Sequence, residues 1–375
     1  MKKIFMLLGA FVLMCSQMPH DTLLKGQVEG LAADDSLWIM TQNGKDTIAA
    51  PNGEFCYKFK ESEPGMVRIF KHPKRLPDGK MEALRMNPIQ LLMFPGQTLS
   101  VKGGFNSYEI SGSAFYDEYN EARKTMRKED SARAAVNEEY MKLMNEKAPR
   151  EQILSKFEEL KKADEKFHER VEEYVMKHMD SEVSLYMLYL YRSRFGEKYI
   201  EKFPETIKNG QLKKLYTELS AHYENMAARR AAAAVIKEGK TAPDFLLKDI
   251  SGKDFALSSL RGKYVVLDFW GSWCGWCVKG FPDMKKMYDK YKGKLEIVGI
   301  DCRDSEDKWK AAVNQHELKW INVINSTDKT KDLTTKYNIP GFPTKFIISP
   351  EGIIEKIVVG EKPEFYETID RLMNK

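Results

Sequence analysis

The chain has 375 residues, of which 42% are hydrophobic and 31% charged, and its formal net charge is +5. This length is enough for about two or three domains. The hydrophobic content is high enough to form their cores, and it therefore excludes an intrinsically disordered protein. Lysines and glutamates interleave almost everywhere. The small positive excess therefore forms no basic surface of the kind that nucleic acid requires, and we expect no nucleic-acid partner.

The N-terminus has the pattern of an export signal. A basic start precedes the short apolar run Ile4–Met14, which cannot span a bilayer because a spanning helix needs about 20 residues. We predict a signal peptide over residues 1–16 and a location in the periplasm or cell envelope. The end of the run, Val12-Leu13-Met14-Cys15, resembles a bacterial lipobox. A lipid anchor at Cys15, which would hold the protein at the outer membrane, and ordinary cleavage near Ser16 both stay open.

Residues 23–113 are predicted to form a small antiparallel, β-sandwich-like domain. Short apolar runs such as Phe55–Phe59 and Met66–Phe70 alternate with turn signals such as Pro51-Asn52-Gly53 and Pro95-Gly96. This spacing of strands and turns is typical of sandwiches and barrels. The region contains no recognisable cluster of titratable residues, so we expect a structural or binding role.

Residues 114–238 are predicted to form an α-helical linker domain. Glycine and proline nearly vanish, and apolar residues recur every three or four positions in charged runs such as Glu138–Lys177. The Leu- and Tyr-rich segment Ser184–Phe195 is interpreted as a buried helix in preference to the lining of a ligand groove. His168 and His178 lack the spacing and the neighbouring cysteines of a metal site.

Residues 239–375 alternate between strand-like and helix-like segments, which predicts an α/β domain around a mixed sheet. The apolar strand Tyr264–Trp270 leads to Cys274-Gly275-Trp276-Cys277, and a helix follows. At such a junction the helix dipole and free backbone N–H groups favour a thiolate over a thiol. A thiolate with a neighbouring thiol is the minimum apparatus for making and breaking disulfides.

The other cysteines do not suggest further chemistry. Cys56 and Cys302 lie in or beside strand-like apolar runs, which favours buried, unreactive thiols. One close pair with two single cysteines is no disulfide framework, but it suits a dedicated redox pair in an oxidising compartment. A zinc site would need two further ligands at similar spacing, which the chain lacks, so we expect no metal.

Residues 239–375 resemble the thioredoxin-like domains of the extracytoplasmic TlpA and ResA type, which are related to the AhpC/TSA proteins. The resemblance rests on Trp273–Cys277, Pro282, Pro340–Thr344 and Gly360. It implies a thioredoxin fold and a thiol-disulfide oxidoreductase whose redox-active disulfide, Cys274–Cys277, takes the place of a cofactor. More loosely, the two preceding regions resemble the β-rich N-terminal domain of unknown function and helical linker found in envelope proteins of Bacteroidota.

The resemblance also implies roles for individual residues. Cys274 is expected to attack and Cys277 to resolve the mixed disulfide. Asp268 lies on an otherwise apolar strand, where burial should raise its pKa, and the resemblance makes it the general base for Cys277. The expected substrate-binding residues, including a cis-proline that turns the preceding backbone toward an extended substrate, are Trp273, Gly275, Trp276, Phe342 and Pro343.

The leading hypothesis is an exported enzyme that reduces disulfides in envelope proteins, with a membrane electron donor as its partner. Gly275-Trp276 lacks the proline of reducing thioredoxins, and Gly280 stands where ResA-type proteins of cytochrome c maturation carry glutamate. A role in haem maturation is therefore not expected. The non-enzymatic alternative is a client-binding, chaperone-like protein with a secondary redox pair. A thiol peroxidase agrees less well, because Gly271 stands where the peroxidase pocket has threonine.

Overall fold

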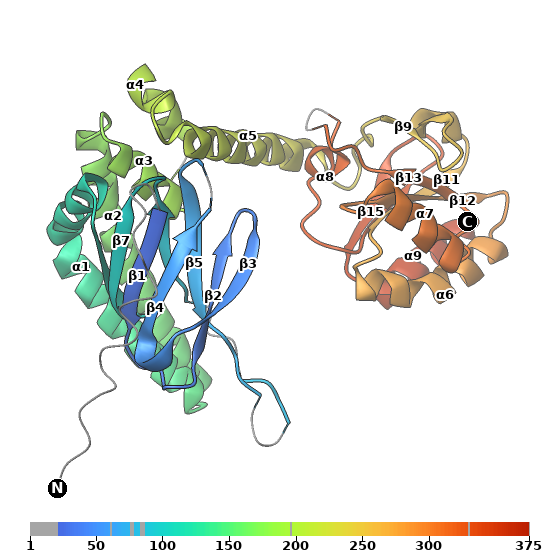
Figure 1. Cartoon of the computed structure of the whole chain (residues 1–375). Coiled ribbons are helices and arrows are strands. Elements are labelled where there is room, and N and C mark those ends of the chain that lie inside the picture. The colour runs from blue at the N-terminus through green and yellow to red at the C-terminus, as the bar shows by residue number, and fades with distance from the viewer. Residues whose placement is uncertain are drawn as a thin grey trace, which may run out of the picture. The chain divides into compact units, whose positions relative to one another are not determined.

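The computed structural model describes residues 22–60, 62–75, 79–82, 87–195, 197–328 and 331–374. The predicted signal peptide over 1–16, with Cys15, lies outside these residues. The chain divides into two compact units, one ending at Ser220 and the other beginning at Ala221. Each unit is described by itself (Figure 1). The finer division into domains at 23–113, 114–238 and 239–375 stays a prediction.

The first unit contains two four-stranded sheets, with strand orders β4-β1-β7-β8 and β3-β2-β5-β6. Alternate residues of the strands are buried, such as Leu37 and Ile39 or Val67 and Ile69, as expected where one face of a sheet covers a core. Neighbouring strands run antiparallel, as predicted, except that β1 pairs in parallel with β7. The strands are β1 (Thr22–Val28), β2 (Ser36–Thr41), β3 (Gly44–Ala49), β4 (Glu54–Phe59), β5 (Gly65–Lys71), β6 (Ile89–Met93), β7 (Thr98–Gly104) and β8 (Ser107–Ser111).

The predicted central helical segment is also present. Ser113 caps the first long helix by accepting a hydrogen bond from the backbone N–H of Tyr116. The Tyr116 hydroxyl accepts a hydrogen bond from the backbone N–H of Leu92 on β6 and donates one to the carbonyl of the same residue. Residues Val183 to Leu188 are buried, which confirms the buried-helix interpretation for the first half of Ser184–Phe195, whereas the helix ends at Leu190 and residues 191–195 form turns. The helices are α1 (Ala114–Asn145), α2 (Arg150–Lys177), α3 (Glu182–Leu190), α4 (Glu205–Lys208) and α5 (Lys213–Val235). Among the described residues, no helix is long and apolar enough to cross a membrane.

The second unit has the predicted α/β architecture around a five-stranded mixed sheet of order β13-β12-β11-β14-β15. β11 is central, parallel to β12 and antiparallel to β14, and it coincides with the predicted strand. The sheet strands are β11 (Tyr264–Trp270), β12 (Leu295–Asp301), β13 (Ile321–Ile324), β14 (Thr344–Ile348) and β15 (Ile354–Val359). The helices are α6 (Gly275–Lys290), α7 (Glu306–Gln315), α8 (Leu333–Lys336) and α9 (Pro363–Met373), and a small hairpin is formed by β9 (Leu246–Lys248) and β10 (Asp254–Ala256).

The central sheet separates two apolar cores. One core, formed with α6, α7 and α9, includes Val266 and Trp270 of β11 together with Cys274 and Cys277. The opposite core includes Val265, Leu267 and Phe269 of the same strand. Because successive strand residues point to opposite faces, Asp268 lies on the face that carries the two cysteines.

Candidate active site

The two cysteines lie where β11 gives way to α6. Cys274 caps the helix: its Sγ accepts a hydrogen bond from the backbone N–H of Cys277 at 3.2 Å. The two residues are joined by a disulfide, and they are 6% and 2% exposed, respectively. The helix N-terminus thus presents its N–H groups and positive dipole end to the Cys274 sulfur, which stabilises a thiolate there once the disulfide is reduced.

Beside the disulfide lies an aromatic surface. Trp273 and Trp276 are 47% and 65% exposed, which is unusual for such large apolar side chains. The Trp273 indole is fixed by its Nε1–H, which donates to the carbonyl of Cys302 at 2.9 Å. Its ring contacts that of Phe342, with centroids 5.2 Å apart. The guanidinium of Arg303 lies over both rings, a contact that no sequence pattern indicated.

Gly271 makes room for this arrangement. A Cβ at this position would lie 2.4 Å from the Trp273 Nε1 and 2.9 Å from the carbonyl oxygen of Cys302. Any larger residue would displace the indole or the backbone. A threonine at this position, as in the peroxidase pocket, would therefore clash with the Trp273 indole in this chain.

The substrate-binding residues predicted from the loop before β14 are also present on this side of the domain. The Phe342–Pro343 peptide bond is cis, as predicted, and Phe342 packs against the core that contains both cysteines. At Gly275 a Cβ would meet no atom within 4 Å, so this position is open. The contribution of Trp273, Gly275, Trp276, Phe342 and Pro343 to substrate binding stays a prediction.

Asp268 is 1% exposed, and it faces a lysine that sequence reasoning missed. The Lys345 Nζ lies 3.6 Å from Asp268 Oδ1 and 2.7 Å from Glu361 Oε2. Burial raises the pKa of Asp268, as predicted; the Lys345 ammonium opposes this rise and the Glu361 carboxylate adds to it. Lys345 is the one charged residue of β14. A lysine within a strand that is otherwise uncharged could have indicated from the sequence that it pairs with a buried carboxylate.

A second acidic group supports the loop before the cysteines. Asp304 accepts hydrogen bonds from the backbone N–H and the hydroxyl of Ser272, at 2.7 and 2.9 Å. Its neighbour Asp301 is fully buried, and burial, together with the Asp304 carboxylate, raises the pKa of Asp301 to about 8. Asp301 therefore keeps its proton at neutral pH.

The two remaining described cysteines differ from each other. Cys302 is a free, buried thiol whose pKa is raised by burial, which confirms the prediction of an unreactive thiol. The same prediction is wrong for Cys56, which is exposed. Its neighbour Phe55 points into the core, and strand alternation then turns Cys56 outward.

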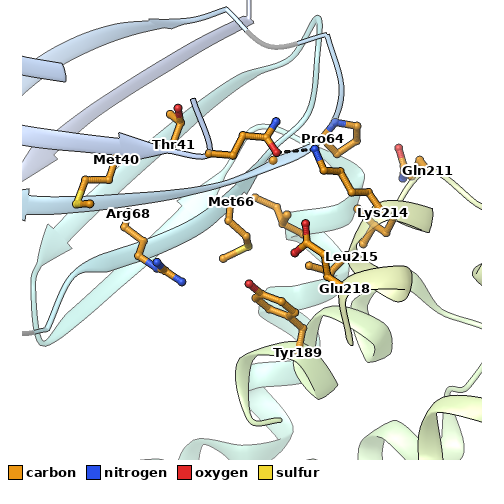
Figure 2. Close-up of a pocket in the computed structure, with 14 residues that line it drawn as sticks. Met40, Thr41, Pro64, Met66, Arg68, Tyr189, Gln211, Lys214, Leu215 and Glu218 are labelled. Carbon is orange, nitrogen blue, oxygen red and sulfur yellow. Dashed lines mark hydrogen bonds between the residues drawn. The ribbon is translucent and has the colours of Figure 1, made fainter. Parts of the chain in front are cut away.

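The first unit has a pocket of about 210 Å³ between the end of β2, the start of β5 and the start of α5 (Figure 2). Met66 and Leu215 contribute apolar surface, and Arg68, Lys214 and Glu218 contribute charge. The Lys214 Nζ donates to the Gln42 side chain at 2.6 Å. No cysteine or histidine lines this pocket, so it offers no redox group. Among the described residues, no cluster of His, Cys, Asp or Glu is arranged to hold a metal ion.

A mixed five-stranded sheet, a cysteine pair at a helix N-terminus and a cis-proline before β14 define a thioredoxin-like domain. Comparisons with known proteins agree. Residues 238–357 match the AhpC/TSA family. Thiol-disulfide oxidoreductase ResA of Bacillus thuringiensis strain Al Hakam is 38% identical over 125 residues, which cover 33% of this chain and 70% of that protein. ResA of Bacillus subtilis strain 168 is 38% identical over 131 residues, 34% of this chain and 71% of that protein.

Among solved structures, the thioredoxin domain of a thiol-disulfide oxidoreductase from Bacteroides vulgatus is 32% identical, with a TM-score of 0.35, and covers 37% of this chain and 99% of that one. The identity to ResA over more than two thirds of its length shows the family. Through its C-terminal region the chain belongs to the ResA-type, thioredoxin-like thiol-disulfide oxidoreductases.

Proposed function

We propose that this protein is an exported enzyme that reduces disulfides in proteins of the cell envelope through Cys274 and Cys277. The observation that carries the proposal is the disulfide at the N-terminus of α6, next to an exposed aromatic surface. A helix end that stabilises a thiolate and a surface that accepts apolar chain segments are what attack on a protein disulfide requires.

The reaction has two exchange steps. In the reduced enzyme the Cys274 thiolate attacks one sulfur of the substrate disulfide, forms a mixed disulfide and releases the other substrate sulfur as a thiolate, which takes a proton from water. Asp268 then accepts the proton of Cys277. The Cys277 thiolate attacks the Cys274 sulfur and releases the second substrate thiolate, which leaves the Cys274–Cys277 disulfide. Two electrons pass from the enzyme thiols to the substrate, and no cofactor or metal takes part.

Substrate recognition would use the surface beside the disulfide. The backbone of Phe342 before Pro343 is suited to pair with an extended substrate segment. Trp273 and Trp276 would contact apolar side chains on either side of the substrate cysteine, and the lack of a side chain at Gly275 would let the substrate backbone approach. This mode tolerates many sequences, as an enzyme with several substrates requires.

Export and the source of electrons belong to the same proposal. Residues 1–16 would direct the chain to the envelope, and a membrane electron donor would return two electrons to the disulfide after each turnover. Fractionation of cells that express the wild type and a Cys15→Ala variant tests the anchor. A lipid anchor predicts that only the wild type sediments with the outer membrane, and identical fractionation would favour a periplasmic protein without an anchor.

The activity is tested by reduction of insulin with dithiothreitol as the electron source. Cys274→Ser should abolish the enzyme-dependent rate, because no thiolate remains at the helix end. Cys302→Ala is the matched control: it removes a buried thiol outside the pair and should retain the rate. Equal turnover by the Cys274→Ser variant and the wild type would refute the proposal. Client binding that persists in a Cys274→Ser, Cys277→Ser double variant would instead favour the chaperone-like alternative.

A further inference from the structure

Three charged side chains from separate segments of the second unit form one buried network. Asp268 lies on β11, Lys345 on β14 and Glu361 two residues after the end of β15. Asp268 and Lys345 are each 1% exposed, and the Glu361 side chain is 17% exposed. The Tyr366 hydroxyl on α9 donates to Glu361 Oε1 at 2.7 Å. Burying a charged side chain costs free energy unless a charge of opposite sign or a hydrogen bond offsets the loss of water, so each member of this network needs such a partner.

Gly280 allows the network to reach α6. A Cβ at this position would lie 2.5 Å from Glu361 Oε2 and 2.7 Å from its Cδ. The Glu361 carboxylate therefore packs directly on the helix backbone, one turn beyond Cys277. With any other residue at position 280, this carboxylate would have to move away from the helix.

The ammonium group of Lys345 is shared unequally. It hydrogen-bonds Glu361 at 2.7 Å but lies 3.6 Å from Asp268, and Asp268 Oδ1 has no hydrogen-bond partner among the described residues. A single cation compensates one carboxylate well and the other poorly. Since Glu361 holds the cation, Asp268 is the poorly compensated carboxylate.

We propose that Glu361 is a positioning residue that sets the basicity of Asp268: by holding Lys345, it keeps Asp268 a strong proton acceptor for Cys277. The inference rests on the proposed function for its role in turnover, but its electrostatic part stands on geometry alone. The other titratable groups that interact with Asp268 are the Tyr366 phenol on α9 and the buried Cys302 thiol after β12. Both are neutral at physiological pH, so Lys345 and Glu361 supply the charge.

Two substitutions should move the pKa of Asp268 in opposite directions. Glu361→Gln frees the Lys345 ammonium for Asp268 and should lower this pKa by roughly one pH unit. Lys345→Met removes the shared cation and should raise it by roughly one pH unit. If the network had a purely structural role, the two substitutions would not shift the pKa of Asp268 in opposite directions.

Gly280→Ala tests the same contact without altering any charge. The new methyl group displaces the end of the flexible Glu361 side chain, so this variant should shift the pKa of Asp268 in the same direction as Glu361→Gln. Glu364→Gln is the matched control, because Glu364 is an exposed glutamate on α9 that pairs with Lys356 instead. It should leave the pKa unchanged.

The experiment has two readouts on the full-length chain. Carbon-13 NMR titration of the Asp268 carboxyl in the oxidised protein measures its pKa without substrate. The rate at which Cys277 resolves a mixed disulfide on Cys274, measured against pH, should show the same opposite shifts. The inference would be overturned if both variants shifted the pKa of Asp268 in the same direction, or if neither variant shifted it. If the two variants shift the pKa of Asp268 in opposite directions but the wild-type protein reduces no disulfide, the electrostatic coupling stands and the proposed function is refuted.

Discussion

Replacement of Asp301 by asparagine should remove a loss of stability that the second unit otherwise suffers as pH rises. Asp301 is buried beside Asp304, the group that fixes Ser272 in the loop before the redox pair. Its folded-state pKa is raised to about 8, whereas an aspartate in the unfolded chain loses its proton near pH 4, at a pKa of about 3.9. The native state therefore holds a proton that the unfolded state has released between these two pH values.

The sign follows from this difference. At this site the unfolded state binds fewer protons than the native state across this window, so the contribution of Asp301 to the free energy of unfolding falls as pH rises from about 4 to about 8. The limiting slope is about 1.4 kcal/mol per pH unit, or at most about 2.7 kcal/mol between pH 5 and 7. Screening by solvent and coupling to Asp304 reduce this value, and we expect a loss of about 1–2 kcal/mol.

Asparagine imitates the protonated carboxyl, because it has nearly the same size and carries no charge, and it does not titrate. The stability of Asp301→Asn relative to the wild type should therefore increase by that amount from pH 5 to pH 7. Urea unfolding followed by tryptophan fluorescence measures it, since every tryptophan except Trp38 lies in the second unit. Asp289→Asn, which alters an exposed carboxylate of α6, is the control. A difference between Asp301→Asn and wild type that is equal at both pH values would refute the reasoning.

Three further predictions concern other parts of the chain. Asp268→Asn should slow the resolution step, seen in stopped-flow as accumulation of the mixed disulfide, while the first attack by Cys274 keeps its rate; wild-type resolution would contradict the assigned base. Gly53→Ala should destabilise the first unit by more than about 1 kcal/mol, because φ is +86° there and a Cβ would lie 1.9 Å from the carbonyl oxygen of Val28; an unchanged circular-dichroism melt of the β signal would count against it. The reduction potential of the cysteine pair should lie near about −270 mV for a reductant, and a value near about −120 mV would indicate an oxidant instead.

The parts of the fold and site that the sequence predicted are those encoded in short segments. Strand Tyr264–Trp270 ends next to the cysteine pair, so the strand, the turn and the start of the helix could be inferred from neighbouring residues alone. The cis bond at Pro343 was implied by the family resemblance, which is carried by the short segment Pro340–Thr344. The alternation of apolar runs and turns likewise identified the β-rich region, although not the parallel pairing of β1 with β7, since strand partners far apart in sequence leave no local pattern.

The parts that were missed depend on contacts between distant segments. Glu361 reaches Lys345 and Gly280 only after β15 is placed in the sheet, and nothing around position 361 distinguishes this glutamate from exposed ones. Arg303 stacks on aromatic rings from two different loops. The prediction for Cys56 failed for a different reason: apolar neighbours indicate a strand, but they do not fix which of its faces a residue occupies.

The central claim, that Cys274 attacks and Cys277 resolves, is tested most directly by trapping. A disulfide-containing substrate such as insulin is mixed with reduced Cys277→Ser or Cys274→Ser protein, and the adducts are identified by mass spectrometry. Cys277→Ser should accumulate a mixed disulfide between Cys274 and the substrate, because no thiol remains to resolve it, whereas Cys274→Ser should give little adduct. Accumulation in the Cys274→Ser variant alone, through Cys277, would contradict the assignment.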